Sequence, residues 1–280
     1  MAEEKDYEYW YKTVGQYERS FKRWEGRAEK IVKKYRDFDR TQNNPSAKFN
    51  ILWSNVQTIT PAVFARLPRP DVSRRFRDND PIGRVASMML ERCLDFELEH
   101  YTDYKTAMQS AVFDRLVGGR GTSWIRYEPH ISAAPGEPED GYEVTEDVDD
   151  YDESQAEQAQ DMVEEIEYEC APVDYVHWKD FGHTYARTWE EVTAVWRKVY
   201  MNRNALVERF GEDMGYAIPL DSKPDQNVKD YEKSMYESQQ ACIYEIWDKE
   251  TEKVIWLSKA LGRILDEQDD PLELEGFFPC

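Results

Sequence analysis

The hydrophobic period of the chain changes near residue 121, and this change limits the folds available to it. Before that point apolar residues recur every three or four positions, which is typical of one face of a helix. After it they mostly alternate with polar residues, which is typical of half-buried strands. The sequence therefore predicts an α+β fold, with long N-terminal helices followed by a mostly antiparallel sheet. We expect a helical region over residues 1–120 and a β-rich region over residues 121–280.

The clearest helical pattern lies near the N-terminus. An apolar stripe rich in aromatic residues repeats at alternating spacings of four and three, through Trp10, Val14, Tyr17, Phe21, Trp24, Ala28, Ile31 and Tyr35. This predicts one amphipathic helix of roughly seven turns. The stripe suits packing on the chain's own domain, and it also suits a broad contact with another subunit. On the second interpretation the candidate interface residues are Trp10, Tyr17, Phe21 and Trp24.

Two further helices are predicted before the change of period. The first covers residues 49–63, with a kink expected at Pro61. The prolines that follow it predict an extended exit. Asp80 is placed to cap the second helix, which we expect to run over residues 81–116 with a break near Asp103.

Strands are expected in five segments, of which the last two form a hairpin across "KETE". They are "TSWIRYEP", "EEIEYECAP", "EVTAVWRKVYM", "ACIYEIWD" and "KVIWLSK". Asn202 is expected to cap a helix that ends at Gly211 or Gly215.

The charge of the chain is concentrated in one place. The net charge is −21, and residues 137–169 hold 16 of the 57 acids and no Lys or Arg. The remaining 41 acids are nearly balanced by the 36 bases, which is unlike a sequence-specific DNA reader with a clustered basic face. The insertion at residues 135–161 has no apolar period, so we expect it to be mobile or weakly helical.

One local cationic cluster precedes the second predicted helix. It comprises Arg66, Arg69, Arg74, Arg75, Arg77 and Arg84. These side chains could contact phosphates, but the excess of acids elsewhere favours ionic contacts within the domain or with a neighbouring subunit. Arg74, Arg75 and Arg77 are the candidate interface residues of this cluster.

The glycine-rich stretch "GGRGTS" at residues 118–123 resembles a phosphate-binding loop only in composition. A P-loop follows a strand, carries a Lys and opens a helix. Here a helix precedes, no Lys is present and a strand follows. The order favours a helix stop at Gly118 or Gly119, with Gly121 allowing a tight reversal.

No catalytic, cofactor-binding or metal-binding signature stands out, so we expect no enzyme and no cofactor. Carboxylate and imidazole groups recur every three residues at Asp174, His177, Asp180 and His183. They could bind a divalent metal only if an irregular loop made them converge, and a polar turn is the favoured interpretation. The four cysteines form no CxxC pair, which favours reduced thiols. No apolar run is long enough for a membrane span.

The succession of segments resembles the portal proteins of tailed bacteriophages, especially those of short-tailed, P22-like phages and prophages. The resemblance runs from about Tyr7 to Cys280. It is carried by the order of the aromatic N-terminal helix, "FNILWSNVQTITPAVFARLPRPDVSRRF", "DPIGRVASMMLERCLDFEL", "AVFDRLVGGRGTSWIRYEP", the acidic insertion, "APVDYVHWKDFGHTYARTWEEVTAVWRKVYMNRNALVERFG", "IYEIWDKETEKVIWLS" and "PLELEGFFPC".

The resemblance implies a structural protein of the virion that forms a ring, usually a dodecamer, at the unique capsid vertex. Double-stranded DNA would be packaged and ejected through it without sequence recognition. It implies as partners further copies of the chain, the terminase large subunit, capsid proteins and tail or head-completion proteins, in the virion and, during assembly, in the host cytoplasm. It also implies a wing-like part without the stem and clip of a longer portal. The alternatives are an acidic adaptor or scaffold that binds basic partners, and a metal-dependent enzyme centred on Asp174.

Overall fold

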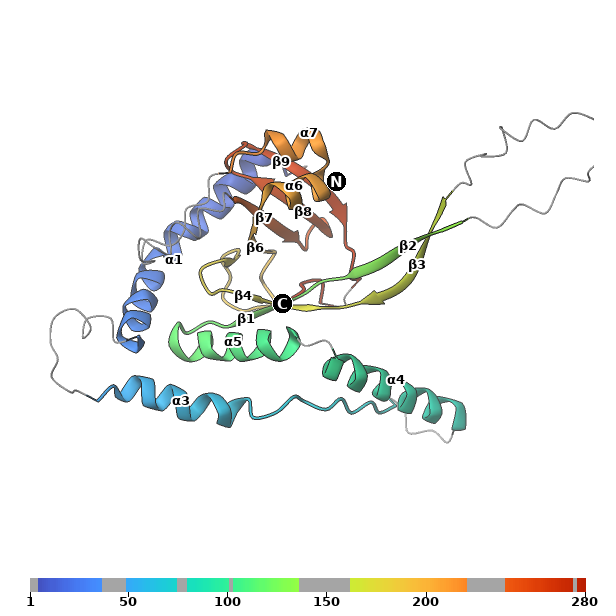
Figure 1. Cartoon of the computed structure of the whole chain (residues 1–280). Coiled ribbons are helices and arrows are strands. Elements are labelled where there is room, and N and C mark those ends of the chain that lie inside the picture. The colour runs from blue at the N-terminus through green and yellow to red at the C-terminus, as the bar shows by residue number, and fades with distance from the viewer. Residues whose placement is uncertain are drawn as a thin grey trace, which may run out of the picture. The chain divides into compact units, whose positions relative to one another are not determined.

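The computed structural model describes residues 5–36, 49–74, 80–100, 103–135, 162–220, 240–273 and 276–280. Its elements confirm the α+β class (Figure 1). The helices are α1 (Tyr7–Tyr35), α3 (Ile51–Val63), α4 (Pro81–His100), α5 (Asp103–Val117), α6 (Arg203–Phe210) and α7 (Glu212–Ala217). The strands are β1 (Thr122–Ile125), β2 (Glu128–Pro135), β3 (Met162–Cys170), β4 (Val173–Val176), β5 (Phe181–His183), β6 (Ala194–Met201), β7 (Ala241–Asp248), β8 (Lys253–Ser258) and β9 (Arg263–Asp269).

The chain divides into two compact units, at limits that differ from the boundary expected at residue 120. The first unit comprises residues 1–126 and 173–280, and the second comprises residues 127–172. Helices and strands share the first unit because α1 packs directly on a sheet, so the change of hydrophobic period is not a domain boundary. The predicted acidic insertion at residues 135–161 lies almost entirely outside the described residues.

The first unit is built on a five-stranded antiparallel sheet in the order β5-β6-β7-β8-β9. The predicted hairpin is present as β7 and β8, with Trp247 opposite Val254. Its turn contains Glu252 at a φ of 55°. Near-continuous apolar sequences in β6 and β7 indicate strands buried on both faces, and most residues of these two strands are buried or half-buried.

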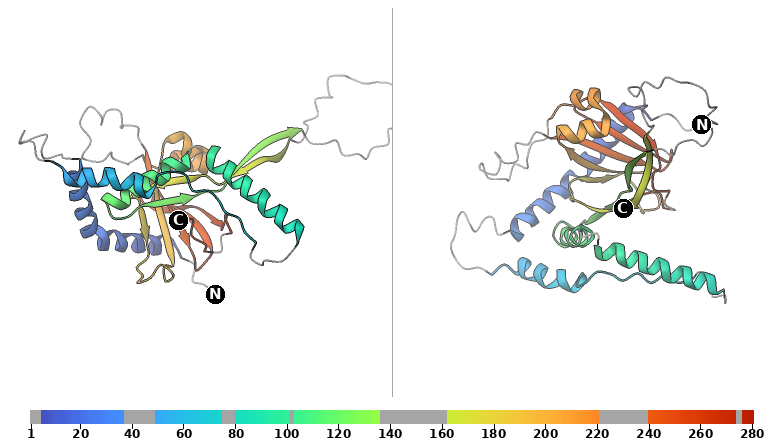
Figure 2. Two further views of the ribbon diagram at one scale, coloured as in Figure 1. Left: turned by 90° about the horizontal axis from the view of Figure 1, so that it is seen from below. Right: turned by 45° about the vertical axis from the view of Figure 1, so that its right-hand side comes forward.

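Both faces of this sheet are covered (Figure 2). On one face, the first half of α1 contributes Trp10, Val14 and Tyr17 to a core with residues of β6, β7 and β8 such as Trp196 and Ile246. Side chains of the alternate positions point to the other face, as the two-residue period of a strand requires. There they form two clusters, one with residues of β1, β4 and the C-terminal segment and one with residues of α6 and the segment that follows α7.

Ion pairs hold α1 to the sheet beside this core. Asp6 caps the helix by accepting a hydrogen bond from the Tyr9 amide. Lys5 donates to the fully buried carboxylate of Asp248 at 2.7 Å. Glu18 accepts from Lys259 at 3.0 Å and from the Tyr244 hydroxyl at 3.0 Å. Polar bonds at both ends of the buried stripe therefore fix the position of α1 along the sheet.

The turn between α5 and β1 confirms the helix-stop interpretation of "GGRG". The amides of Gly118 and Gly119 both donate to the carbonyl of Asp114, and Gly119 has a φ of 92°. A Cβ atom on Gly121 would lie 1.9 Å from the carbonyl oxygen of Ala111, so only glycine fits this close approach. β1 then pairs with β4 in a separate two-stranded sheet, against which α5 packs.

The helices α3 and α4 begin at side-chain caps. Asn50 caps α3 by accepting from the Trp53 amide, and its amide group donates to the carbonyls of Lys34 and Tyr35 at the end of α1. Pro61 lies in the last turn of α3, so the helix ends two residues later rather than continuing through the expected kink. The Asp80 carboxylate caps α4 as predicted, accepting from the second and third amides of the helix.

The second unit contains a two-stranded ribbon, with β2 antiparallel to β3 and a register shift after His130. The rings of His130 and Tyr168 stack with centroids 4.0 Å apart. The Tyr127 hydroxyl donates to Glu169, and the Cys170 thiol donates to the carbonyl of Glu128. These contacts lie at the end of the ribbon where β2 begins and β3 ends.

Three local predictions differ from the structure. "TSWIRYEP" is divided between β1 and β2, which belong to different sheets, because the chain leaves the first sheet at Arg126. The helix capped by Asn202 ends at Gly211 (φ 81°), which is one of its two expected ends, but the separate helix α7 that follows was not predicted. β9 was not predicted, since "RILDEQD" is mostly polar and lies at the edge of the sheet.

Replacing Gly121 with Ala should lower the free energy of unfolding by about 1–3 kcal/mol, because the new methyl group collides with the backbone of α5. The matched control is Gly26→Ala within α1, where nothing lies within 4 Å of the added carbon. This control should gain about 1 kcal/mol from helix propensity. Urea unfolding of both variants measures the difference, and equal stabilities would contradict the close approach at Gly121.

Replacing Glu18 with Gln tests the ion pairs of α1. Burial raises the pKa of Glu18, but Lys259, Lys198 and the Tyr244 hydroxyl together outweigh it, so the folded pKa lies below the ordinary 4.5. The carboxylate therefore stabilises the fold fully above that value and loses its effect as the pH falls through the folded pKa.

Glu18→Gln should be less stable than the unsubstituted chain at pH 7, and the difference should shrink as the pH falls below about 4. Burial lowers the pKa of Lys259, and the Glu18 charge beside it opposes that effect. Urea unfolding between pH 3 and pH 7 measures the effect, with the exposed Glu208→Gln as a control. A difference that does not vary with pH would contradict the ion pairs.

Candidate subunit interface

Arg120, in the middle of the glycine-rich stretch, turns its side chain into the first unit. Its guanidinium donates to the Tyr17 hydroxyl at 2.5 Å and to the carbonyls of Trp178 and Phe181 at 2.5 and 2.9 Å. Its central carbon lies 4.7 Å from the ring centroid of Trp24 and 5.2 Å from that of Phe181. Arg120 therefore joins α1 to the segment from Trp178 to Phe181. Both terminal nitrogens of its guanidinium already donate within the protein, so they are not available to bind a phosphate.

The aromatic stripe of α1 is used largely inside the protein. Trp10 is 0% and Tyr17 is 7% exposed, which favours packing on the chain's own sheet over contact with a neighbour. Phe21 and Trp24 are partly buried, and both lie beside the Arg120 guanidinium. Burial raises the pKa of Tyr17 despite the opposing effect of the nearby Arg120 charge. The subunit-contact role of these four residues stays a prediction.

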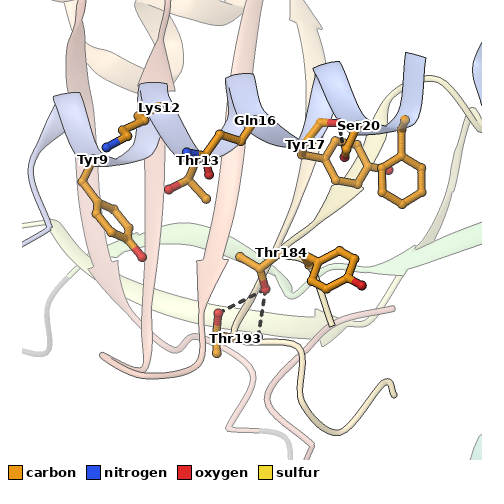
Figure 3. A pocket seen from close by; sticks show the side chains of 10 residues that line it. Tyr9, Lys12, Thr13, Gln16, Tyr17, Ser20, Thr184 and Thr193 are labelled. Atoms are coloured by element: carbon orange, nitrogen blue, oxygen red, sulfur yellow. Dashed lines mark hydrogen bonds between the residues drawn. The ribbon is translucent and has the colours of Figure 1, made fainter. Parts of the chain in front are cut away.

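A groove of about 580 Å³ opens beside this stripe, between α1 and the chain that flanks β5 and β6 (Figure 3). Its lining is rich in hydroxyl groups, and the Thr184 hydroxyl is bonded to Thr193. Tyr185, which also lines it, is 87% exposed. The lining residues are Tyr9, Lys12, Thr13, Gln16, Tyr17, Ser20, Phe21, Thr184, Tyr185 and Thr193. They include one cation and no carboxylate, so the groove offers hydrogen bonds and aromatic surface rather than acid–base chemistry.

The cationic cluster is described in part. Arg74 packs against the start of α4, donating to the carbonyl of Asp80 at 3.1 Å with its guanidinium 3.7 Å from the Asp80 carboxylate. Arg75 and Arg77 lie outside the described residues. Arg66 and Arg69 are exposed and form no hydrogen bond or ion pair with the described part of the chain. Two of the predicted interface cations therefore cannot be placed, and Arg74 serves to hold the entry to α4.

The four residues considered for a metal site do not come together. Asp174 binds Arg126 and Arg197 at 2.6 and 2.9 Å, in a network that continues from Arg197 to Glu245 at 2.6 Å. Within the described ranges, no group of three His, Cys, Asp or Glu side chains could hold a metal ion.

The remaining three candidates have separate partners. Asp180 accepts from the Tyr200 hydroxyl, and burial raises the pKa of this carboxyl. Burial lowers the pKa of His183, whose Nδ1 contacts the carbonyl of Thr184. The Nδ1 of His177 accepts from the Lys179 amide. His177 and Asp180 therefore lie at a polar turn, which was the favoured interpretation, whereas Asp174 belongs to β4 and His183 to β5.

In the described part of the chain, many of the exposed large apolar side chains belong to α3 and α4. No residue of α4 is buried, and only Val56 of α3 is buried. In α4 the exposed fraction is 78% for Ile82, 61% for Met89 and 56% for Phe96. Further exposed apolar side chains lie in the two helices or just before α3. They are Phe49, Ile51, Trp53, Ile59, Val63, Val85, Met88, Leu90 and Leu94. The sequence analysis missed this surface, although "MML" in α4 breaks the one-sided pattern of a helix that packs on a single core.

Comparisons with known proteins identify no relative. The chain matches no protein-family model, and a search of curated proteins returns no significant match. No helix in the described ranges is long and apolar enough to cross a membrane. The exposed helices α3 and α4 are therefore the candidate site on structural grounds alone.

Replacing Arg120 should destabilise the first unit. Arg120→Met removes three donors from buried acceptors, and we expect a loss of about 2–4 kcal/mol in the free energy of unfolding. Arg120→Lys should recover little of this loss, because a single ammonium cannot reproduce the planar fork. Chemical unfolding measures both variants, with the exposed Arg263→Met as the matched control. Full recovery by Lys would show that charge alone matters at this position.

Proposed function

We propose that this protein is a portal-type subunit of a tailed-phage particle, and that copies of it form a closed ring through which double-stranded DNA passes. The resemblance in the order of its segments suggested this function. One structural observation supports it further. Among the described residues, none of α4 is buried and large apolar side chains such as Ile82, Met89 and Phe96 are exposed, although Arg74 holds the start of the helix. A helix of this kind is buried in the state in which the protein works. Repeated contact between identical subunits is the simplest way to bury it.

The charge of the chain is compatible with a conduit for DNA. Protein–DNA affinity depends mainly on cations placed against phosphates. Net charge −21 and the absence of a large clustered basic face both oppose such retention. In this proposal the ring guides DNA without reading its sequence. The terminase large subunit, the capsid and the tail or head-completion proteins are its proposed partners, in the virion and in the host cytoplasm during assembly.

The proposal assigns no reaction to the chain. The pKa shifts in the described part belong to groups that hold the fold together. Asp114, for example, accepts from the Tyr175 hydroxyl and the Trp178 amide, and its pKa is raised by burial. This carboxylate fixes the turn that contacts Arg120, so its perturbed pKa has a structural explanation.

The native mass of the purified chain tests the proposed function, together with negative-stain images of the same sample. The expected result is closed rings whose mass is a multiple of 33.2 kDa, near twelve copies. A stable monomer at every concentration would contradict the proposal. A closed dimer would also contradict it, because a two-fold interface satisfies the exposed surface without forming a ring.

A further inference from the structure

The segment from α3 to α4 carries two features at once, an exposed apolar surface and unpaired charges of opposite sign. We propose that α4 of one copy packs along α3 and the residues that follow it, 64–74, in the next copy. This contact rests on the proposed function and specifies how the ring is held together. The apolar part of α4 would cover Ile59 and Val63 of the neighbour, and the acidic end of α4 would meet Arg66 and Arg69.

The acidic end of α4 is unfavourable for an isolated chain. Asp95, Glu97 and Glu99 lie in the last two turns, where the partial negative charge of the helix terminus repels them. Asp95 and Glu99 are also four residues apart on one face, which adds a like-charge repulsion. None of the three forms an ion pair or hydrogen bond within the described residues. Cations from outside the chain would relieve both repulsions.

Matching cations are available on the complementary surface. Arg66 and Arg69 are exposed and have no partner in the described ranges, and Asp71 is the single acid between Phe64 and Arg74. They directly follow the exposed apolar residues Ile59 and Val63 of α3. On both surfaces, exposed apolar residues come first along the chain and charged residues follow them. The charged residues are basic on the α3 side and acidic on the α4 side.

The partner that this arrangement favours is a second copy of the chain. A head-to-tail contact uses two different patches of the same molecule, and such contacts generate closed rings when the rotation between copies allows it. The α3 side and the α4 side are two such patches, of opposite charge. Complementary charges would also fix the direction in which copies add, since like ends would repel.

The proposal is tested with two charge-reversed variants of the full 280-residue chain. One carries Arg66→Glu and Arg69→Glu, and the other carries Asp95→Lys, Glu97→Lys and Glu99→Lys. None of the five side chains has a partner within the described ranges, so the folds should persist, and thermal unfolding checks this. The first variant's matched control is Arg19→Glu with Arg23→Glu, which changes the same charge on exposed positions of α1.

Each variant alone should lose the assembly and run as a 33.2 kDa monomer, whereas the control should assemble like the unsubstituted chain. A mixture of the two variants in equal amounts should restore the assembled mass, because every contact between alternating copies is again between opposite charges. The measurement is analytical ultracentrifugation at two salt concentrations, and the restored mass should fall at the higher one.

The remaining outcomes separate this proposal from the proposed function. Rings formed by either variant alone would overturn the contact but leave the ring function standing. A mixture that stays monomeric, while a single chain carrying all five reversals assembles, would place the charge pairs within one copy and also overturn it. A dimer that the variants dissociate would support the contact and contradict the ring. An unsubstituted chain that is always monomeric would overturn both, and the surface would then belong to a different partner.

Discussion

The Arg120 guanidinium is the contact on which the arrangement of the first unit depends. It joins three segments that are distant in sequence, because its donors reach the Tyr17 hydroxyl on α1, the Trp178 carbonyl in the turn before β5 and the Phe181 carbonyl at the start of β5. The flanking glycines make this geometry possible. Gly119 reverses the chain after α5, and Gly121 lets the backbone pass within contact distance of that helix. The three glycines around Arg120 thus allow its guanidinium to lie between α1 and the segment that leads into β5.

The five-stranded sheet explains how one acidic chain holds a large core. α1 covers one face, and α6 with elements from the two-stranded sheet covers the other. Its central strands are therefore largely apolar on both faces, and the buried polar residues among them include the pair formed by Arg197 and Glu245 and the carboxylate of Asp248. Arg197 lies 4.9 Å from the ring of Trp124, and Glu245 accepts from the indole of Trp247. Aromatic side chains thus lie on both sides of the pair. Removal of Arg197 would leave the buried Glu245 carboxylate without its cation, whereas Arg197 also pairs with Asp174.

Much of the fold could be predicted from local patterns, and the failures have physical causes. The stripe of α1, the Asp80 and Asn202 caps and the hairpin of β7 and β8 all follow from spacing or capping chemistry. The division of "TSWIRYEP" depends on pairing with the distant strands β3 and β4, which local periodicity does not report. β9 pairs with its sequence neighbour β8, but its mostly polar sequence gives no strand pattern. The limits of the two compact units likewise depend on contacts that the order of elements does not specify.

The candidate site was less predictable than the fold. The interface residues expected on α1 proved to be mostly buried or partly buried, whereas the exposed apolar surface belongs to α4, whose apolar residues are not confined to one face. A sequence pattern shows that a face is apolar but does not say which chain covers it. Arg66 and Arg69 were recognised as part of a cationic cluster, but their lack of partners is visible only in the structure.

The isolation of α4 has a consequence for the order of events in assembly. A helix without core contacts has only its own backbone bonds and local side-chain pairs, and such helices are marginal in water. Its amide hydrogens should therefore exchange with solvent far faster than those of β7, because local opening there breaks no packing. Ordering α4 and joining two copies then become one thermodynamic step. In such a coupled step, part of the contact energy offsets the ordering entropy, so assembly is more sensitive to concentration and temperature than the buried area alone would suggest.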